Sequence, residues 1–159
     1  MILGLGLPCS GTATLAAELG LGHEYCNSLG TVDWQLIYPK GWIRKPFGSP
    51  VQFDRSEVTK IIIVKRHPLS MVPCFCKKVL NNSKATNYIP VTTFVPDQEY
   101  LALCYIKEML RTLNLFKADK VYDVTDFSTI RNSSNEVRDT NWLRKTKLLK
   151  QCEALYEAR

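Results

Sequence analysis

Residues 2–19 read ILGLGLPCSGTATLAAEL, and the rest of the chain is organised around them. The apolar start predicts a buried parallel strand. A turn rich in Gly, Pro and Ser follows, and then Leu15, Ala16 and Leu19 recur at helical spacing. Strand, glycine turn and helix together are typical of a phosphate-binding loop, because backbone N–H groups and the helix N-terminus face an anion there.

The P-loop of nucleoside triphosphatases has the pattern G-x-x-x-x-G-K-[ST]. Gly6 and Gly11 have the required separation, but Thr12-Ala13 follows in place of Lys-Ser/Thr. The lysine for a β/γ-phosphate and the hydroxyl for Mg²⁺ are therefore absent from this pattern. The stretch predicts a phosphate loop without triphosphate chemistry, and a tight turn without a ligand is the alternative.

Composition and charge predict one globular domain over residues 1–159. The net charge of +6 suits an anionic ligand, and the spread of the basic residues argues against nucleic acid. No apolar run reaches the roughly 20 residues of a membrane span, and no signal peptide is recognisable, so we expect a cytoplasmic location.

The six cysteines lack metal-site spacing and predict reduced thiols and no metal. Cys9, at a helix N-terminus, is expected to be the most reactive thiol.

Lys60-Ile-Ile-Ile-Val-Lys65 is the clearest strand, because it is continuous and rich in β-branched residues. Arg66 follows at its carboxyl end, where open α/β sheets bind ligands. A guanidinium there is suited to grip a phosphate, although a structural salt bridge is the other interpretation. Ser70 is expected to cap a helix over residues 71–80, and His67 is expected to cap or pack.

The remaining pattern completes an α/β fold: a three-layer domain of the P-loop type, with a short central parallel sheet flanked by helices. Gly20 is expected to end the first helix, and residues 21–25 to return His23 and Glu24 to the sheet edge. A helix over 97–116, a strand over 120–124 and a C-terminal amphipathic helix follow. Residues 38–54 predict a long loop, to which we assign acceptor recognition.

Pro8-x-Ser10-Gly11-Thr12-x-Thr14 and the strand ending in Arg66 resemble the two motifs of sulfotransferases that use 3′-phosphoadenosine 5′-phosphosulfate (PAPS). The resemblance implies that the first loop wraps the 5′-phosphosulfate and that Arg66 binds the 3′-phosphate. The family has a serine eight residues after this arginine, where the chain has Cys74, and Ser70 lies one turn earlier. The residues assigned to the cofactor are Cys9, Ser10, Gly11, Thr12, Ala13 and Thr14 in the first loop, and Arg66, Ser70 and Cys74 after the second strand motif.

The implied activity is transfer of a sulfonate from PAPS to a hydroxyl or amine of a small-molecule or glycan acceptor, leaving 3′-phosphoadenosine 5′-phosphate (PAP). Glu24 is the expected base and His23 the alternative. Cys9 stands where the family usually has Lys or Arg, so another cation (Lys40, Arg44 or Lys45) would have to stabilise the leaving phosphate. Two other functions remain open: a catalytically degenerate anion- or nucleotide-binding protein, and a P-loop nucleotide kinase, against which the missing lysine argues.

Overall fold

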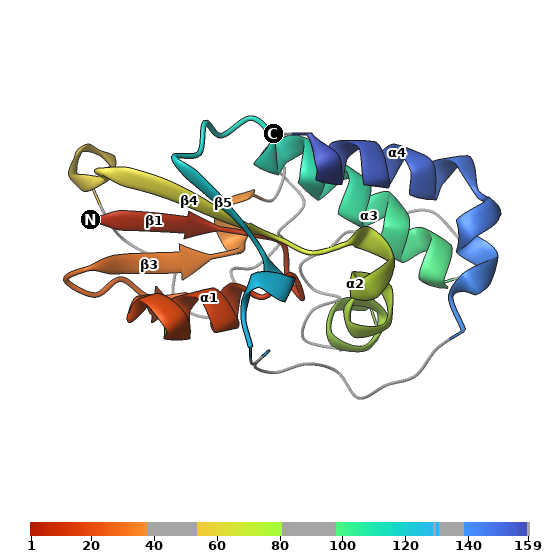
Figure 1. Cartoon of the computed structure of the whole chain (residues 1–159), viewed down its shortest axis with the longest axis horizontal. Coiled ribbons are helices and arrows are strands. Elements are labelled where there is room, and N and C mark those ends of the chain that lie inside the picture. Colours follow the sequence, from red (N-terminus) through yellow and green to blue (C-terminus); the bar gives the residue numbers. More distant parts are fainter. Residues whose placement is uncertain (38–53, 81–97, 129, 131–138, 159) are drawn as a thin grey trace.

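Five parallel strands form one sheet in the order β2-β3-β1-β4-β5 (Figure 1). The computed structural model describes residues 1–37, 54–80, 98–128, 130 and 139–158. The strands are β1 (Ile2–Leu5), β2 (Gly22–His23), β3 (Gly30–Asp33), β4 (Lys60–Lys65) and β5 (Lys120–Asp123), and the α-helices are α1 (Thr12–Leu19), α2 (Pro68–Phe75), α3 (Gln98–Leu113) and α4 (Lys147–Glu157). The predicted α/β fold with a short parallel sheet is confirmed.

Helices cover both faces of the sheet. Val32, Ile62 and Val64 face α1, where Leu15 and Ala16 complete a small apolar cluster. The alternate positions of the same strands face α2, α3 and α4 and form the larger core, which includes Leu3, Leu5, Ile63, Phe75, Leu103, Ile106, Leu110 and Leu149. Figure 1 shows α2, α3 and α4 grouped together, apart from α1. Burial on both faces explains why β4 is continuously apolar, as parallel strands usually are.

The elements with the strongest sequence patterns were predicted accurately. β4 has the predicted bounds, Gly20 ends α1 in the left-handed conformation, and α3 buries Leu103, Ile106, Leu110 and Leu113 as expected. The helix after β4 is a correction: α2 begins at Pro68, not at residue 71. Its N-cap is His67, whose Nδ1 accepts a hydrogen bond from Leu69 N–H over 3.3 Å, and Ser70 is therefore not the cap. Proline at the first helical position favours this earlier start.

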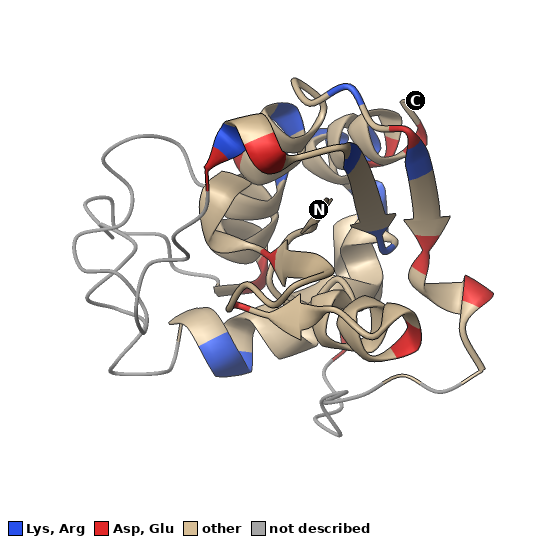
Figure 2. Cartoon of the chain, turned by 90° about the vertical axis from the view of Figure 1, so that its left-hand side faces the viewer, with Lys and Arg blue, Asp and Glu red and all other residues tan. Residues whose placement is uncertain are grey.

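Charged residues are distributed over the described surface without one dominant sign. Figure 2 shows Lys and Arg on several elements, interspersed with Asp and Glu. Of the helices that the structure describes, none combines the length and apolar character that crossing a membrane requires. The predicted acceptor loop falls almost entirely on residues 38–53, with its candidate cations Lys40, Arg44 and Lys45, and these lie outside the described residues.

Candidate functional site

The site lies where the connections of two neighbouring strands diverge. β1 and β4 are paired in parallel, with Leu5 opposite Ile63. From β1 the chain runs through α1 to β2, toward one edge of the sheet. From β4 it runs to β5, at the opposite edge. Such a topological switch point opens a crevice at the carboxyl ends of the strands, which is where ligands bind in open α/β sheets. Residues 6–11 and Arg66 follow these two strand ends.

Glycines 6 and 11 are fixed by the close packing of the loop. A Cβ on Gly6 would lie 2.7 Å from Ser10 Oγ and 2.8 Å from Val64 Cγ1. Gly11 has φ +102° and caps α1, and a Cβ there would lie 2.6 Å from Val124 Cγ2. Only glycine accommodates both the conformation and the space at residue 11. The loop is therefore held tightly against the sheet, as a phosphate-binding turn must be.

The loop hydroxyls assigned to the cofactor point into the protein. Ser10 Oγ donates to the Leu7 carbonyl over 2.7 Å and is buried. Thr12 Oγ1 is hydrogen-bonded to His23 Nε2 at 3.1 Å, and the Thr14 side chain is also buried. Gly11 provides no side-chain cap, so the first N–H groups of α1 have no acceptor within the helix. The loop consequently offers an anion its backbone donors rather than these hydroxyls.

Arg66 links the end of β4 to the loop after β1. It follows β4 directly, is half-buried, and donates from Nη1 to the Cys9 carbonyl oxygen over 3.2 Å. This places a guanidinium against the loop. Within the described chain, Arg66 forms no salt bridge. The alternative interpretation as a structural ion pair therefore finds no support among these residues.

The two candidates on α2 have different environments. Ser70 is exposed in the first turn, whereas Cys74 is buried one turn later. The Cys74 thiol is hydrogen-bonded to the thiol of Cys9. Cys9 and Cys74, the two positions at which the chain departs from the sulfotransferase pattern, therefore lie close to each other. The exposed Ser70 side chain does not occupy the buried environment of Cys74.

The thiol pair reverses the expectation for Cys9. Its hydrogen bond with Cys74, together with burial, raises the pKa of the Cys9 thiol. The same hydrogen bond lowers the pKa of Cys74 to about 7, and the positive charges of Lys78 and Arg66 act in the same direction. The raised pKa runs against the prediction that Cys9 is the most reactive thiol, and its causes are the neighbouring Cys74 thiol and burial. Cys74 is the more acidic member of the pair.

A second group of polar side chains lies on the other side of Thr12. His23 ends β2, and its Nε2 atom is 3.6 Å from Glu24 Oε1. Trp34 Nε1 donates a hydrogen bond to the same Glu24 oxygen. Glu24 has φ +62°, a conformation that is strained for a residue with a Cβ and that often occurs at functional sites. Burial lowers the pKa of His23, so this imidazole is neutral at pH 7.

Asp33 belongs to this group and was not singled out from the sequence. It ends β3 opposite Leu5 of β1, and its side chain is fully buried. Gln35 N–H donates to Asp33 Oδ1 over 2.7 Å, but none of the described residues donates to Oδ2. Burial raises the pKa of Asp33 to about 6, with a further contribution from the charge of Glu24. A single aspartate at the end of a four-residue strand does not stand out in a sequence. Its place beside Leu5 of β1 can be recognised only when the order of the strands is known.

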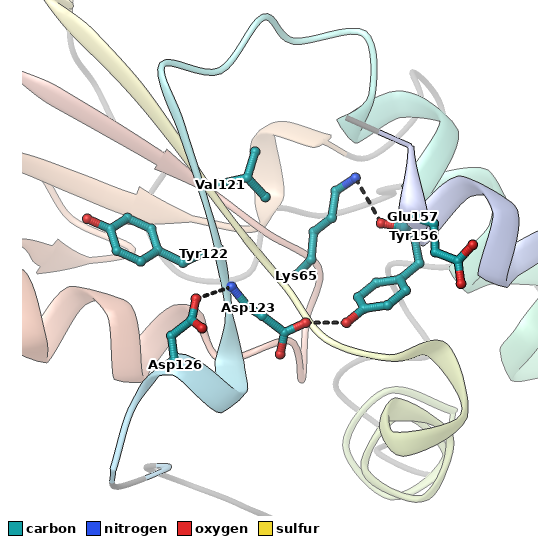
Figure 3. A pocket seen from close by; sticks show the side chains of 7 residues that line it. All are labelled: Lys65, Val121, Tyr122, Asp123, Asp126, Tyr156 and Glu157. Carbon is teal, nitrogen blue, oxygen red and sulfur yellow. Dashed lines mark hydrogen bonds between the residues drawn. The ribbon is translucent and has the colours of Figure 1, made fainter.

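A cavity of about 300 Å³ lies between β5 and the end of α4 (Figure 3). Lys65 is buried beside it and donates from Nζ to the Ala158 carbonyl at 2.7 Å and to Asn114 Oδ1 at 3.0 Å. Tyr156 donates its hydroxyl hydrogen to Asp123. Burial raises the pKa of Asp123, but hydrogen bonds from Tyr156 and Thr125 outweigh it and leave the pKa lowered. These contacts fix α4 to the sheet.

The chain has no match among protein-family models, curated proteins or solved structures with which it was compared. The resemblance to sulfotransferases consequently stays a prediction, carried by the motifs of the loop and of the strand before Arg66.

Proposed function

We propose that the chain is a sulfotransferase that moves a sulfonate from PAPS to a hydroxyl or amine acceptor in the crevice between β1 and β4. The observation that carries the proposal is the contact between Arg66 and the Cys9 carbonyl, because it unites the two motifs of the sequence in one place. A glycine loop with backbone donors and an arginine beside it are both suited to phosphate groups.

The residues of the crevice fit the anionic ends of the nucleotide. The tight packing around Gly6 and Gly11 leaves backbone N–H groups at the start of α1 for the 5′-phosphosulfate. Arg66 is assigned to the 3′-phosphate. Ser70 is exposed in the first turn of α2 and is retained as a hydroxyl for the same group, whereas the buried Cys74 lies beside the Cys9 thiol.

Glu24 is assigned the role of base. When bound, PAPS supplies the electrophilic sulfur and a phosphate leaving group. Glu24 accepts the proton of the acceptor hydroxyl or amine, and the indole N–H of Trp34 holds the carboxylate in place. His23 remains the alternative base, since it is neutral at pH 7 and linked to the loop through Thr12. The acceptors that we propose are small molecules or glycans.

A second function is supported by one specific observation. Cys9 occupies the loop position at which a cation would stabilise the leaving phosphate, and its thiol is engaged by Cys74. A protein with this loop would bind a nucleotide or another anion without transferring sulfonate. The two functions share the binding step and differ in turnover.

Thermal denaturation with PAP, with ADP and with ATP–Mg²⁺ tests the binding step, in wild type and in Arg66→Ala. A ligand at a hundred times its Kd stabilises a protein by about 2.7 kcal/mol, which is several degrees for a domain of this size. We expect stabilisation by PAP that exceeds that by ADP and that Arg66→Ala abolishes. Stabilisation by ATP–Mg²⁺ alone would favour a kinase, and no response to any nucleotide would refute the proposal.

A further inference from the structure

We propose that the cavity between β5 and the end of α4 is a binding site for a short aliphatic diamine. The cavity has a volume of about 300 Å³ and lies at the β5 edge of the sheet (Figure 3). Pockets for small organic molecules begin at about this size. Within the described chain, no three acidic, histidine or cysteine side chains are grouped as metal ligands. The cavity therefore suits an organic cation better than a metal ion.

The residues that line the cavity carry an excess of negative charge. Asp123 and Asp126 come from the end of β5 and the turn after it, and Glu157 comes from the last turn of α4. None of these three carboxylates forms an ion pair with a described residue. Among the described lining residues, Lys65 is the only cation. Three negative charges thus face one positive charge, which favours a ligand with two positive charges.

Asp123 is contacted by neutral donors only. Tyr156 donates its hydroxyl hydrogen to this carboxylate, and Thr125 donates its N–H at 3.0 Å and its O–H at 2.7 Å. Burial raises the pKa of Asp123, but these hydrogen bonds outweigh burial and leave the pKa lowered, so the carboxylate is charged at pH 7. Lys120 is directed elsewhere: its Nζ lies 4.5 Å from the centre of the Tyr122 ring, which points away from Asp123 in Figure 3.

The wall formed by α4 already holds one primary ammonium group, that of Lys65. Its Nζ donates to the Ala158 carbonyl at 2.7 Å, to the Tyr156 carbonyl at 3.4 Å and to Asn114 Oδ1 at 3.0 Å. Carbonyl groups at the C-terminus of an α-helix carry partial negative charge and favour cations. Because Lys65 occupies these carbonyls, we assign the ammonium groups of the ligand to the carboxylates.

Two ammonium groups joined by a short apolar chain match this arrangement. One group is assigned to Glu157, and the other to Asp123 and Asp126, which lie across the cavity from it in Figure 3. The methylene groups between them are assigned to Val121 and the Tyr156 ring, the apolar part of the lining. The bound diamine would link the end of α4 to the turn after β5.

Isothermal titration calorimetry of the full chain with putrescine tests the proposal. We expect one saturable site per chain. n-Butylamine should bind about tenfold more weakly, because one charge-assisted contact is lost, and butane-1,4-diol should not bind. The lining includes no residue assigned to PAPS or to the base, so the result does not depend on the proposed function. The absence of saturable binding by putrescine, or equal binding of the diol, would overturn the proposal.

Two variants assign the binding to this cavity. Glu157→Gln should weaken putrescine binding about tenfold, whereas Glu18→Gln, an equally exposed change on α1, should leave it as in the wild type. Val121→Phe fills the cavity without a change of charge and should abolish binding, with its fold checked by circular dichroism. If Val121→Phe does not fold, the two glutamate variants decide. Wild-type affinity in Glu157→Gln, or equal weakening in both glutamate variants, would overturn the proposal.

Hydrogen–deuterium exchange locates the ligand by an independent measurement. Saturating putrescine should slow the exchange of amides in residues 120–126 and 155–158 at least threefold, because it links these two segments. Exchange in α1 should not change. Protection that is confined to other segments would place the diamine elsewhere and refute the assignment.

Discussion

Arg66, directly after β4, donates a hydrogen bond of 3.2 Å to the carbonyl oxygen of Cys9 in the loop after β1. The contact joins residues 57 positions apart and places a permanent positive charge beside the turn. The stability of the loop and its affinity for anions are therefore expected to depend on the same side chain.

Replacement of Arg66 should affect stability even without a ligand. We expect Arg66→Ala to lower the free energy of unfolding by about 1 kcal/mol, because the Cys9 carbonyl loses a charged donor. Arg66→Lys keeps the charge but not the planar fork and should recover part of the loss. Arg111→Ala is the control, since its exposed pair with Glu108 is worth less than about 0.5 kcal/mol. Equal losses in the urea denaturation of both alanine variants would contradict this prediction.

Substitution of the two glycines that flank α1 should separate backbone strain from steric conflict. Gly20→Ala introduces a Cβ at φ +67° with no atom within 4 Å, so it should cost about 1 kcal/mol from strain alone. Gly11→Ala combines φ +102° with a contact of 2.6 Å to Val124 and should cost about 3 kcal/mol. Calorimetric melting temperatures measure the difference. Adding Val124→Ala should relieve only the steric part, and full recovery would show that the backbone is unstrained.

Asp33 should make the fold less stable as the pH rises. Its pKa is about 6 in the folded protein, against an ordinary value of 3.8, so the folded state binds the proton more tightly than the unfolded state. This stabilisation is complete below about pH 4 and is lost between pH 4 and pH 6, on the order of 3 kcal/mol in total. Asp33→Asn should remove the change over this interval in urea denaturation.

Asp54 provides the matched control for Asp33. It is exposed, and hydrogen bonds from Ser56 lower its pKa, the opposite direction. Asp54→Asn should therefore leave the decline between pH 4 and pH 6 in place. A decline that persists in Asp33→Asn with its wild-type size would assign it to another group.

Glu24→Gln separates transfer from binding. The amide retains an oxygen for the indole N–H of Trp34 but cannot accept a proton from the acceptor. We expect PAP to stabilise this variant as it does the wild type, while PAP release from PAPS is lost with 4-nitrophenol, cyclohexylamine and N-acetylglucosamine as trial acceptors. Glu18→Gln, an exposed change on α1, should behave as the wild type in both assays. Normal turnover in Glu24→Gln would transfer the role of base to His23.

Local patterns were sufficient for much of the fold. The run from Lys60 to Lys65 predicts β4 to the residue, since a continuous β-branched segment is favourable only when both faces are buried. The apolar stripe of α3 likewise follows from the helical spacing of its buried leucine and isoleucine residues. The error at Ser70 arose because two start signals compete, and the His67-Pro68 pair begins the helix three residues earlier than a cap at Ser70 would.

The candidate site depended more on tertiary structure. Arg66 and the glycine loop were predictable, because each follows a recognisable strand and carboxyl ends of parallel strands meet at one edge. Asp33 was missed, since its importance comes from its register beside Leu5. The proximity of Cys9 and Cys74 was also missed, because no sequence pattern relates a turn to the second turn of a distant helix.

The central place of β1 has a consequence for how the chain folds during synthesis. β1 pairs with β3 on one side and with β4 on the other, and so it has no complete set of neighbours until residue 65 is available. At 5–20 residues per second, about 3–12 s separate the emergence of β1 from that of β4. During this interval β1 lacks one of the two strands that flank it. α4 docks later still, because the carbonyl of Ala158, which caps this helix, accepts a hydrogen bond from Lys65, 93 residues earlier in the chain.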